Sequence, residues 1–183
     1  FTEQYPQVQV DLVEANTAQL TERLFSGSLD LLIDNKHMDP AVYQKSFFSE
    51  EHLLLAVPTR LAVNEKMKNY ALTASDIREN RHLNSRIPPV PLENFQNESF
   101  LLLKSGNDTR SRADRICQNA HIIPKVKLEL DQQITAYNLS RYGMGISFCS
   151  DTLVRHVPDD EGLVYYKLNH QDALREVHFY YKR

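Results

Sequence analysis

The sequence lacks any long apolar run and any recognisable leader. Its longest purely apolar runs span four or five residues, as in Leu53 to Val57, whereas a membrane-spanning helix needs about 20. Residues Phe1 to Pro6 show no basic stretch followed by an apolar one, so they do not read as a secretory signal. The chain also has no initiator Met, which favours a fragment or a processed chain. We therefore expect a cytoplasmic protein with no membrane contact.

A basic excess is also absent. The 183 residues contain 21 Lys and Arg against 24 Asp and Glu, for a net charge of -3. Surfaces that bind nucleic acid are usually basic, because neutralising phosphates supplies much of their affinity. The one basic cluster, Arg110, Arg112 and Arg115, is interrupted by Asp108 and Asp114, which is typical of a solvated helix with mixed ion pairs. The chain itself is not expected to contact DNA.

Cysteine is scarce. Cys117 and Cys149 lie 32 positions apart, without the spacing of a metal site, and each has apolar or small neighbours. We predict two buried free thiols, which fits a reducing compartment. The length and the 42% hydrophobic content suit one domain or two small lobes with a real core.

The hydrophobic periodicity predicts an α/β fold. The first third reads strand, helix, strand, which implies a right-handed crossover between parallel strands. Segments near 53–57 and 144–149 are placed to carry the chain between two lobes. A helix is expected to start at 73–76. The predicted strands are 8–12, 29–33, 43–48, 51–57, 99–103, 125–130, 145–149, 163–168 and 176–181, and the predicted helices are 17–27, 105–119, 132–142 and 150–156.

No enzyme motif is present. The seven histidines show no metal-like spacing, and neither a Gly-x-Ser-x-Gly elbow nor a phosphate-binding loop occurs. The run from Gly143 to Phe148 has two of the dinucleotide-binding glycines, but it follows a helix, so Gly143 reads better as a helix C-cap. The sequence therefore predicts no catalytic residue, no cofactor and no metal.

One polar turn is a candidate anion site. The run Ser105-Gly106-Asn107-Asp108-Thr109-Arg110 joins a predicted strand to a predicted helix. Free N–H groups at a helix start favour an anion, and Gly106 lets a ligand approach the backbone closely. Alternatively the turn only caps the helix, with Asp108 as the cap. The residues alone leave both interpretations open.

A second polar turn, Glu14 to Thr17, also links a predicted strand to a helix. Thr17 offers a hydroxyl beside free N–H groups, although by itself a simple N-cap explains it better. Ligands of open α/β sheets bind at the carboxyl ends of strands. Together, the two turns are therefore a stronger candidate for a ligand site than either turn alone.

Motifs in a fixed order resemble the effector-binding domain of LysR-type transcriptional regulators. They include Val8-x-Val10-x-Leu12-Val13-Glu14, Gly27-x-Leu29-Asp30-Leu31-x-Ile33, Leu54-x-x-Val57-Pro58, Gly106-x-x-Thr109-Arg110 and Gly143-Met144-Gly145-Ile146-Ser147-Phe148. The matches cover nearly the whole chain.

The resemblance implies a periplasmic-binding-protein-like fold of type II, in which two crossover strands join two α/β lobes. The implied lobes are residues 1–57 plus 148–183 and residues 58–147. A small effector, often an organic anion, would sit between them. The implied effector-binding residues are Asn16, Thr17, Ser105, Gly106, Asn107 and Thr109, and Pro58 and Gly145 would lie near the hinge.

Compared with the family pattern, the chain is truncated at both ends, because the first strand and the final helix are missing. Residues 60–98 are also longer than in most relatives. The resemblance implies homo-oligomers, dimers or tetramers, that contact DNA only through an N-terminal winged helix-turn-helix outside this sequence. Two alternatives are a solute receptor of a transport system and an enzyme on the same fold, such as a dehydratase-like relative, for which Asp108 is the nearest acid or base.

Overall fold

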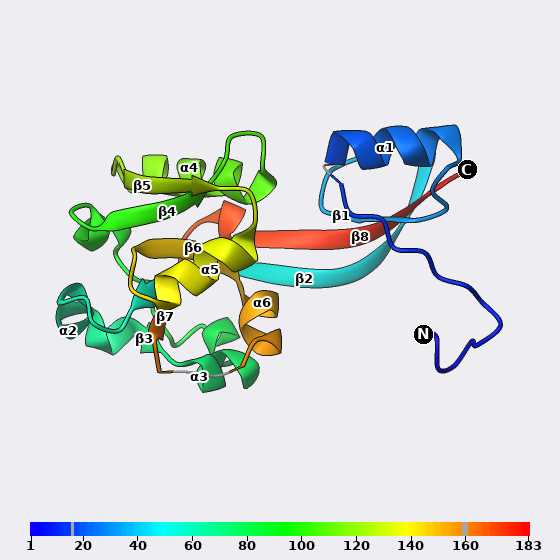
Figure 1. Cartoon of the computed structure of the whole chain (residues 1–183). Helices are drawn as coiled ribbons and strands as arrows, with labels where there is room; N and C mark the ends of the chain where they lie inside the picture. The colour runs from blue at the N-terminus through cyan, green and yellow to red at the C-terminus, as the bar shows by residue number, and fades with distance from the viewer. Residues whose placement is uncertain (16, 159–160) are drawn as a thin grey trace. The chain divides into compact units, whose positions relative to one another are not determined.

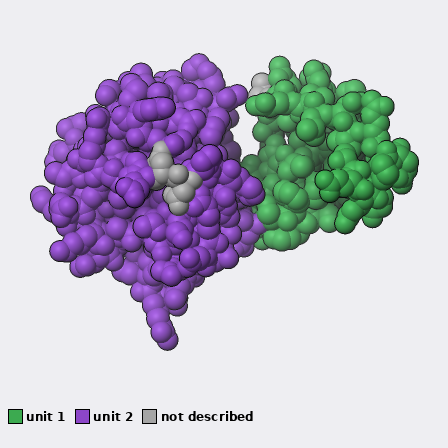
Figure 2. All heavy atoms as spheres, turned by 60° about the horizontal axis from the view of Figure 1, so that its bottom comes forward, with its two compact units in different colours: residues 1–49, 176–183 green, residues 50–175 purple. Residues whose placement is uncertain are grey.

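The computed structural model of the chain describes residues 1–15, 17–158 and 161–183. It has the α/β composition that the periodicity predicts (Figure 1). No helix within these residues is long and apolar enough to cross a membrane. The chain divides into two units that Figure 2 colours separately: residues 1–49 with 176–183 form unit 1, and residues 50–175 form unit 2.

Two strands carry the chain from one unit to the other. They are β2 (Tyr43–Pro58) and β8 (Leu174–Lys182). The prediction of two connecting strands is confirmed, but the second is β8 and not the segment near 144–149. That segment, β6 (Ile146–Ser150), pairs with β2 and with β4 (Ser99–Leu103) inside unit 2. The division also differs from the lobe boundaries inferred from sequence, since residues 50–57 and 148–175 belong to unit 2.

Unit 1 contains α1 (Thr17–Ser26), β1 (Leu32–Asp34) and the outer parts of β2 and β8. The predicted helix 17–27 is confirmed, and Gly27 follows it with a φ of +79°. Its core gathers Leu24, Leu32, Met38, Tyr43 and Tyr180. The strand β1 pairs antiparallel with β8, with Leu32 opposite Tyr180.

The strand predicted at 8–12 is wrong. These residues form no strand, and Val8, Val10 and Leu12 are exposed by 42%, 46% and 94%. An alternating pattern becomes a strand only where a neighbouring edge supplies hydrogen bonds, and no strand pairing among the described residues involves this segment. The parallel strand–helix–strand unit expected in the first third is therefore not formed.

Unit 2 is built on a mixed sheet in the order β3–β7–β2–β6–β4–β5. The pairs β4–β5 and β4–β6 are parallel, and the others are antiparallel. Helix α5 packs against β4 and β6, α4 against β4, and α3 against α6 (Figure 1). The remaining elements of this unit are α2 (Val63–Met67), η1 (Lys68–Tyr70), β3 (Ala71–Leu72), α3 (Ala74–Arg78), η2 (Arg81–Leu83), η3 (Leu92–Phe95), α4 (Asp108–Asn119), β5 (Lys125–Leu130), α5 (Gln133–Arg141), α6 (Asp151–His156), β7 (Leu163–Lys167) and η4 (Gln171–Ala173).

The apolar run of β2 forms the centre of unit 2. Leu53, Leu55 and Val57 lie in one core cluster, and Leu54 and Ala56 lie in the other. Alternate strand residues face opposite sides of a sheet, so a run that is apolar throughout fits a strand covered on both sides. The two predicted strands 43–48 and 51–57 are thus one continuous strand, in which Tyr43 and residues 53–58 are buried and the residues between them are exposed or partly buried.

Helix starts and ends follow local chemistry. Thr73 and Asp76 form a capping box at α3, and Ser150 caps α6 by accepting from the backbone N–H of Leu153. The C-cap residue of α5 is Tyr142, and Gly143 directly after it has a φ of +79°, so the predicted helix end at this glycine is confirmed while the cap itself lies one position earlier. Cys117 and Cys149 are buried free thiols, as predicted.

Candidate functional site

The turn that opens α4 is the candidate site of unit 2. It leaves the carboxyl end of β4, where Ser105 and Gly106 are exposed and Gly106 has a φ of +90°. Asn107 is the N-cap, because its Oδ1 accepts from the N–H of Thr109 at 2.9 Å. The sequence-based assignment of Asp108 as the cap is therefore wrong: Asp108 is the first residue of the helix. The cap uses the N–H of Thr109, and the N–H of Asn107 donates to the carbonyl of Lys104 at 3.3 Å, while Ser105 and Gly106 beside them are exposed residues at a helix start, a position that favours anions.

The positive charges around this turn are already paired. Arg110 donates to Glu129 at 2.5 Å, to Asp114 at 2.9 Å and to the carbonyl of Leu103 at 2.8 Å. Hydrogen bonds from Arg110 to these carboxylates raise its pKa. Lys104 contacts Asp131 at 2.8 Å. Arg110 is thus a structural residue that fixes α4 to β4 and β5, and any recognition by the turn rests on N–H groups and hydroxyls.

Arg175 ties the turn to the connecting strands. Its Nε donates to Glu51 at 2.7 Å, while its Nη1 donates to Thr109 Oγ1 at 3.2 Å and to Asp108 at 3.3 Å. Thr109 is buried, so its hydroxyl lies behind the turn. Glu51 and Arg175 belong to β2 and β8, at the points where both strands enter unit 2. Arg175 thus connects the turn to both strands by hydrogen bonds.

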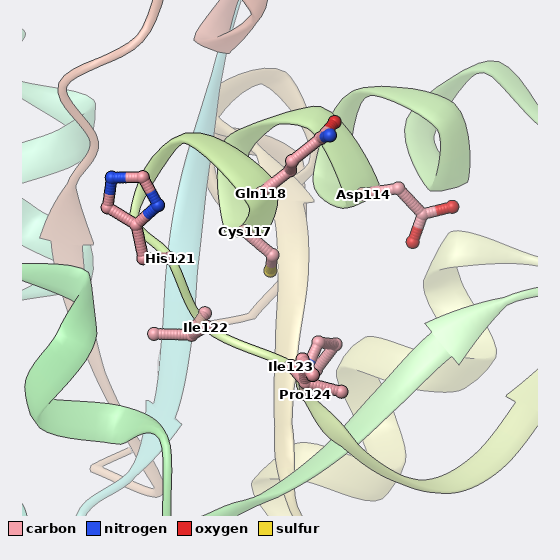
Figure 3. A pocket seen from close by; sticks show the side chains of 7 residues that line it. All are labelled: Asp114, Cys117, Gln118, His121, Ile122, Ile123 and Pro124. Atoms are coloured by element: carbon pink, nitrogen blue, oxygen red, sulfur yellow. The ribbon is translucent and has the colours of Figure 1, made fainter.

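The turn does not itself enclose a cavity. The space beneath it, between Leu103, Thr109 and Ala136, measures about 10 Å³, so a ligand has to lie on its outer side. Larger hollows of unit 2 lie elsewhere. One of about 620 Å³ lies between Thr59, Thr73 and Leu163 at the β3 edge. Another, of about 410 Å³, lies at the end of α4 between Cys117, His121 and Ile123 (Figure 3).

The other predicted effector contacts belong to unit 1. Thr17 is the first residue of α1, is partly buried, and its carbonyl accepts from the hydroxyl of Thr21 at 2.7 Å. Asn16 lies outside the described residues. Thus Ser105, Gly106, Asn107 and Thr109 are brought together on one turn, while Thr17 lies in a separate unit. That these residues form one effector site stays a prediction.

The predicted hinge residues both lie within unit 2. Pro58 ends β2 opposite Leu163 of β7. Gly145 precedes β6, and a Cβ added there would lie 2.7 Å from the carbonyl oxygen of Ser99. Gly145 is thus needed for close backbone approach between β6 and β4. Neither residue is at the unit boundaries, 49/50 and 175/176, and a hinge role for them stays a prediction.

A polar cluster that the sequence did not predict lies inside unit 2. His52, His82 and Asp151 bring their ligating atoms within 4.8 Å of one another. Burial disfavours the charged form of Asp151, but hydrogen bonds from His52, His82 and Arg155 outweigh it and hold the pKa of this carboxyl well below its usual range. The three residues lie 30 and 69 positions apart, so no motif spacing could have shown them.

Comparison with known proteins identifies the family. The family described as "LysR substrate binding domain" matches residues 1–183. The uncharacterized HTH-type transcriptional regulator YcgK of Bacillus subtilis (strain 168) is 26% identical over 165 residues, covering 90% of this chain and 49% of the relative. YybE of the same strain, also an uncharacterized HTH-type transcriptional regulator, is 29% identical over 153 residues, covering 82% and 44%. The chain spans about half the length of these relatives.

Solved structures agree on the fold. The CcmR regulatory domain of Synechocystis PCC6803 in complex with 2-PG matches with a TM-score of 0.76 at 17% identity, covering 99% of this chain and 77% of that one. The BenM effector binding domain with its effector benzoate matches with a TM-score of 0.69 at 22% identity, covering 100% and 73%. The periplasmic-binding-protein-like fold is thereby confirmed, and the named relatives are regulators rather than transport receptors. The chain therefore belongs to the LysR substrate-binding domain family.

Proposed function

We propose that the chain is the effector-sensing part of a bacterial LysR-type transcriptional regulator and that it binds a small organic anion. The family match over the whole chain carries this proposal. The turn after β4 supports the ligand class, because the exposed residues Ser105 and Gly106 precede the N-terminus of a 12-residue helix, where the helix dipole and a nearby hydroxyl suit a carboxylate. One of the similar structures holds benzoate as its effector.

In the proposed site, Ser105, Gly106 and Asn107 receive the anion at the helix start. Thr109 acts behind them by holding Arg175. Asn16 and Thr17 contribute from the first lobe. Pro58 and Gly145 flank the region in which the backbone adjusts. A ligand that contacts both lobes stabilises the closed form by the difference between its contacts in the two forms.

The whole regulator would act as a homo-oligomer, dimer or tetramer, and would contact DNA only through an N-terminal winged helix-turn-helix. Closure of the effector domain would change the geometry between subunits and thereby the spacing of the DNA-binding arms. The binding of the organic anion would need no cofactor, no metal and no catalytic step. The protein would work in the cytoplasm.

A thermal-shift screen tests the proposal. The chain is titrated with benzoate, succinate, acetate and inorganic phosphate at constant ionic strength. A ligand at 100 times its dissociation constant should stabilise the protein by about 2.7 kcal/mol. Ser105→Ala and Thr17→Val should each weaken the response, whereas Ser85→Ala, a change at an exposed serine of unit 2 outside the turn, should not.

Two results would contradict the proposal. If none of the anions shifts the melting temperature, the organic-anion class is wrong. If one does and the shift persists in both Ser105→Ala and Thr17→Val, the ligand binds elsewhere.

A further inference from the structure

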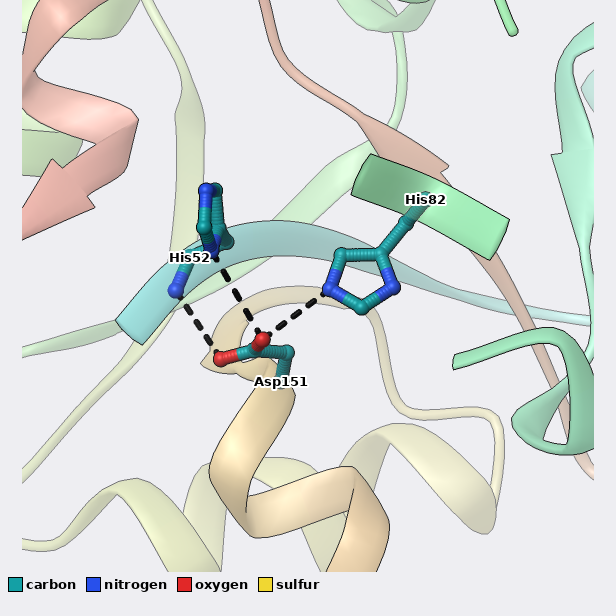
Figure 4. A group of neighbouring side chains, drawn as sticks. All are labelled: His52, His82 and Asp151. Atoms are coloured by element: carbon teal, nitrogen blue, oxygen red, sulfur yellow. Dashed lines mark hydrogen bonds and ion pairs between the residues drawn. The ribbon is translucent and has the colours of Figure 1, made fainter. Parts of the chain in front are cut away.

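A group of metal-binding side chains lies in unit 2 apart from the α4 turn. His52 is on β2, His82 is on η2, and Asp151 is the first residue of α6. Figure 4 shows the carboxylate of Asp151 between the two imidazole rings. Three elements that are distant in sequence thus converge on one carboxylate.

Two of the three separations between ligating atoms lie close to those of a transition-metal site, and all three atoms lie within 4.8 Å of one another. Nε2 of His82 lies 2.9 Å from Asp151 Oδ2, and Nδ1 of His52 lies 3.7 Å from the same oxygen. Nitrogen and oxygen ligands about 2.1 Å from a tetrahedral Zn²⁺ ion are roughly 3.4 Å apart. The observed distances lie on either side of this value. Shifts of less than about 1 Å in these ligating atoms would bring each pair to the spacing expected between two zinc ligands.

The site is held in place by bonds that a metal would leave intact. Asp151 Oδ1 accepts from the backbone N–H groups of His52 and Thr152, each at 2.9 Å. These two bonds orient the carboxylate and keep Oδ2 facing the rings. His52 Nε2 lies 3.8 Å from Glu50, and carboxylates commonly orient metal-bound histidines from this outer position.

His82 is an almost fully buried imidazole. It is 1% exposed, and its Nδ1 has no hydrogen-bond partner in the described part of the chain. An unpaired buried polar atom costs on the order of 1–3 kcal/mol. A ring held at that cost with Nε2 directed at the carboxylate points to a role beyond stability.

The structure shows from which side an ion can reach the cluster and which cation it would displace. The His52 side chain is 27% exposed, so an ion can reach the cluster from that side, and water can complete the coordination. Arg155 donates to Asp151 Oδ2 at 2.9 Å and is the cation that an ion would displace. Since its side chain is 30% exposed, the guanidinium can turn to solvent.

We propose that His52, His82 and Asp151 form a binding site for a divalent ion of the Zn²⁺, Co²⁺ and Ni²⁺ class. Two imidazoles and one carboxylate favour these ions over Mg²⁺ and Ca²⁺, which prefer oxygen ligands throughout. His52 lies three residues after the boundary between the units, on a strand that joins them. The bound ion joins β2 to η2 and α6 and so provides a second input, independent of the organic anion.

The test is a titration of the chelator-treated chain with Co²⁺, followed by visible absorption, and with Zn²⁺, followed by calorimetry and thermal shift. His52→Ala is the informative variant, because it removes a ligand but keeps the backbone N–H that holds Asp151. His156→Ala is the matched control, since His156 is an exposed histidine on the same helix as Asp151. Asp151→Asn is the second ligand variant.

We expect one ion per chain, a Co²⁺ spectrum typical of nitrogen and oxygen ligands, and a rise in melting temperature with Zn²⁺. His52→Ala should weaken binding by about tenfold or more and abolish the thermal shift, while His156→Ala should change neither. The absence of binding at millimolar Zn²⁺, or equal binding by the parent and His52→Ala, would overturn the site and leave the cluster as a buried ion-pair network.

Discussion

Arg175 and Glu51, which are 124 positions apart in sequence, form a close ion pair in which Nε of the arginine lies 2.7 Å from the carboxylate. Their side chains are only 15% and 14% exposed. The pair joins β8 to β2 where both strands enter unit 2, and Arg175 extends the connection to Thr109. The stability of the protein depends on buried contacts of this kind.

Loss of Arg175 should destabilise the protein. Arg175→Met leaves the carboxylate of Glu51 largely buried without its partner, and we expect the free energy of unfolding to fall by about 2 kcal/mol, between the values for exposed and buried pairs. Urea denaturation measures this. Glu51→Gln and the double variant complete a double-mutant cycle in which the two losses of stability should not add.

Lys104→Met is the control, because the pair between Lys104 and Asp131 is 58% and 76% exposed and should contribute under about 1 kcal/mol. Equal losses of unfolding free energy in Arg175→Met and Lys104→Met would contradict a special contribution of the buried pair to stability.

The contributions of Ser140 and Ser147 to stability should likewise depend on each other. Ser140 donates to Ser147 at 2.8 Å, and both are fully buried. Ser140→Ala should cost about 1–2 kcal/mol, because the hydroxyl of Ser147 is left without its partner. The double change to alanine should cost less than the sum of the single changes. Additive losses in chemical denaturation would show that the two hydroxyls are satisfied separately.

Gly145 should tolerate no side chain. An added Cβ would meet the backbone carbonyl of Ser99 at 2.7 Å, so Gly145→Ala has to push β6 away from β4. We expect a loss of about 2–3 kcal/mol by thermal or urea unfolding. Gly27→Ala provides the comparison: nothing lies within 4 Å of its added Cβ, and the cost of its positive φ is about 1–2 kcal/mol. A smaller loss at Gly145 than at Gly27 would disagree with the close contact between the strands.

The stability of the fold should fall in acid as Asp172 becomes protonated. A hydrogen bond from Arg115 holds the pKa of this carboxyl below its ordinary value. Because the folded pKa is below the unfolded one, the contribution to stability is fully present above about pH 4 and is lost as the pH falls through the folded pKa. Asp172→Asn should therefore reduce the drop in stability between pH 5 and pH 2, measured by urea unfolding across that range. An unchanged slope in this variant would assign the acid sensitivity to other carboxyls.

The cysteines should be unreactive in the folded protein. Burial raises the pKa of Cys117 to about 12 and raises that of Cys149 as well, so both thiols are protonated at neutral pH. Native protein should resist iodoacetamide, and mass spectrometry should detect two labels only after denaturation. Rapid labelling of either residue would mean that its segment opens locally.

Local patterns predicted most of unit 2. The turn at 105–109 could be placed from sequence because an apolar strand, a glycine and a capping residue follow one another directly. The error at Asp108 was one of a single position, since Asn107 and Asp108 are both good caps. The helix end at Gly143 was predicted correctly for the same reason, because a helix end depends on its own few residues.

Pairing between distant residues could not be predicted in this way. The segment 8–12 has the alternation of a strand, but a strand needs a partner that its own pattern does not specify. The continuity of β2 was hidden because residues 44–52, after Tyr43, include no buried residue that would reveal an alternating face. Arg175, which holds Thr109, and the cluster around Asp151 depend on contacts across 66 and 69 positions and leave no trace in motif spacing.

The way in which the two units share the chain bears on the order in which they are made. Residues 50–175 form unit 2 as one uninterrupted stretch, whereas unit 1 needs residues from both sides of it. A chain emerging from the ribosome thus carries all of unit 2 before Tyr180, the strand partner of Leu32, is synthesised. The core around Leu24 is therefore the last for which all residues are available. A premature stop directly after residue 175 would accordingly leave residues 1–49 attached to the full length of unit 2, without the strand that closes their own core.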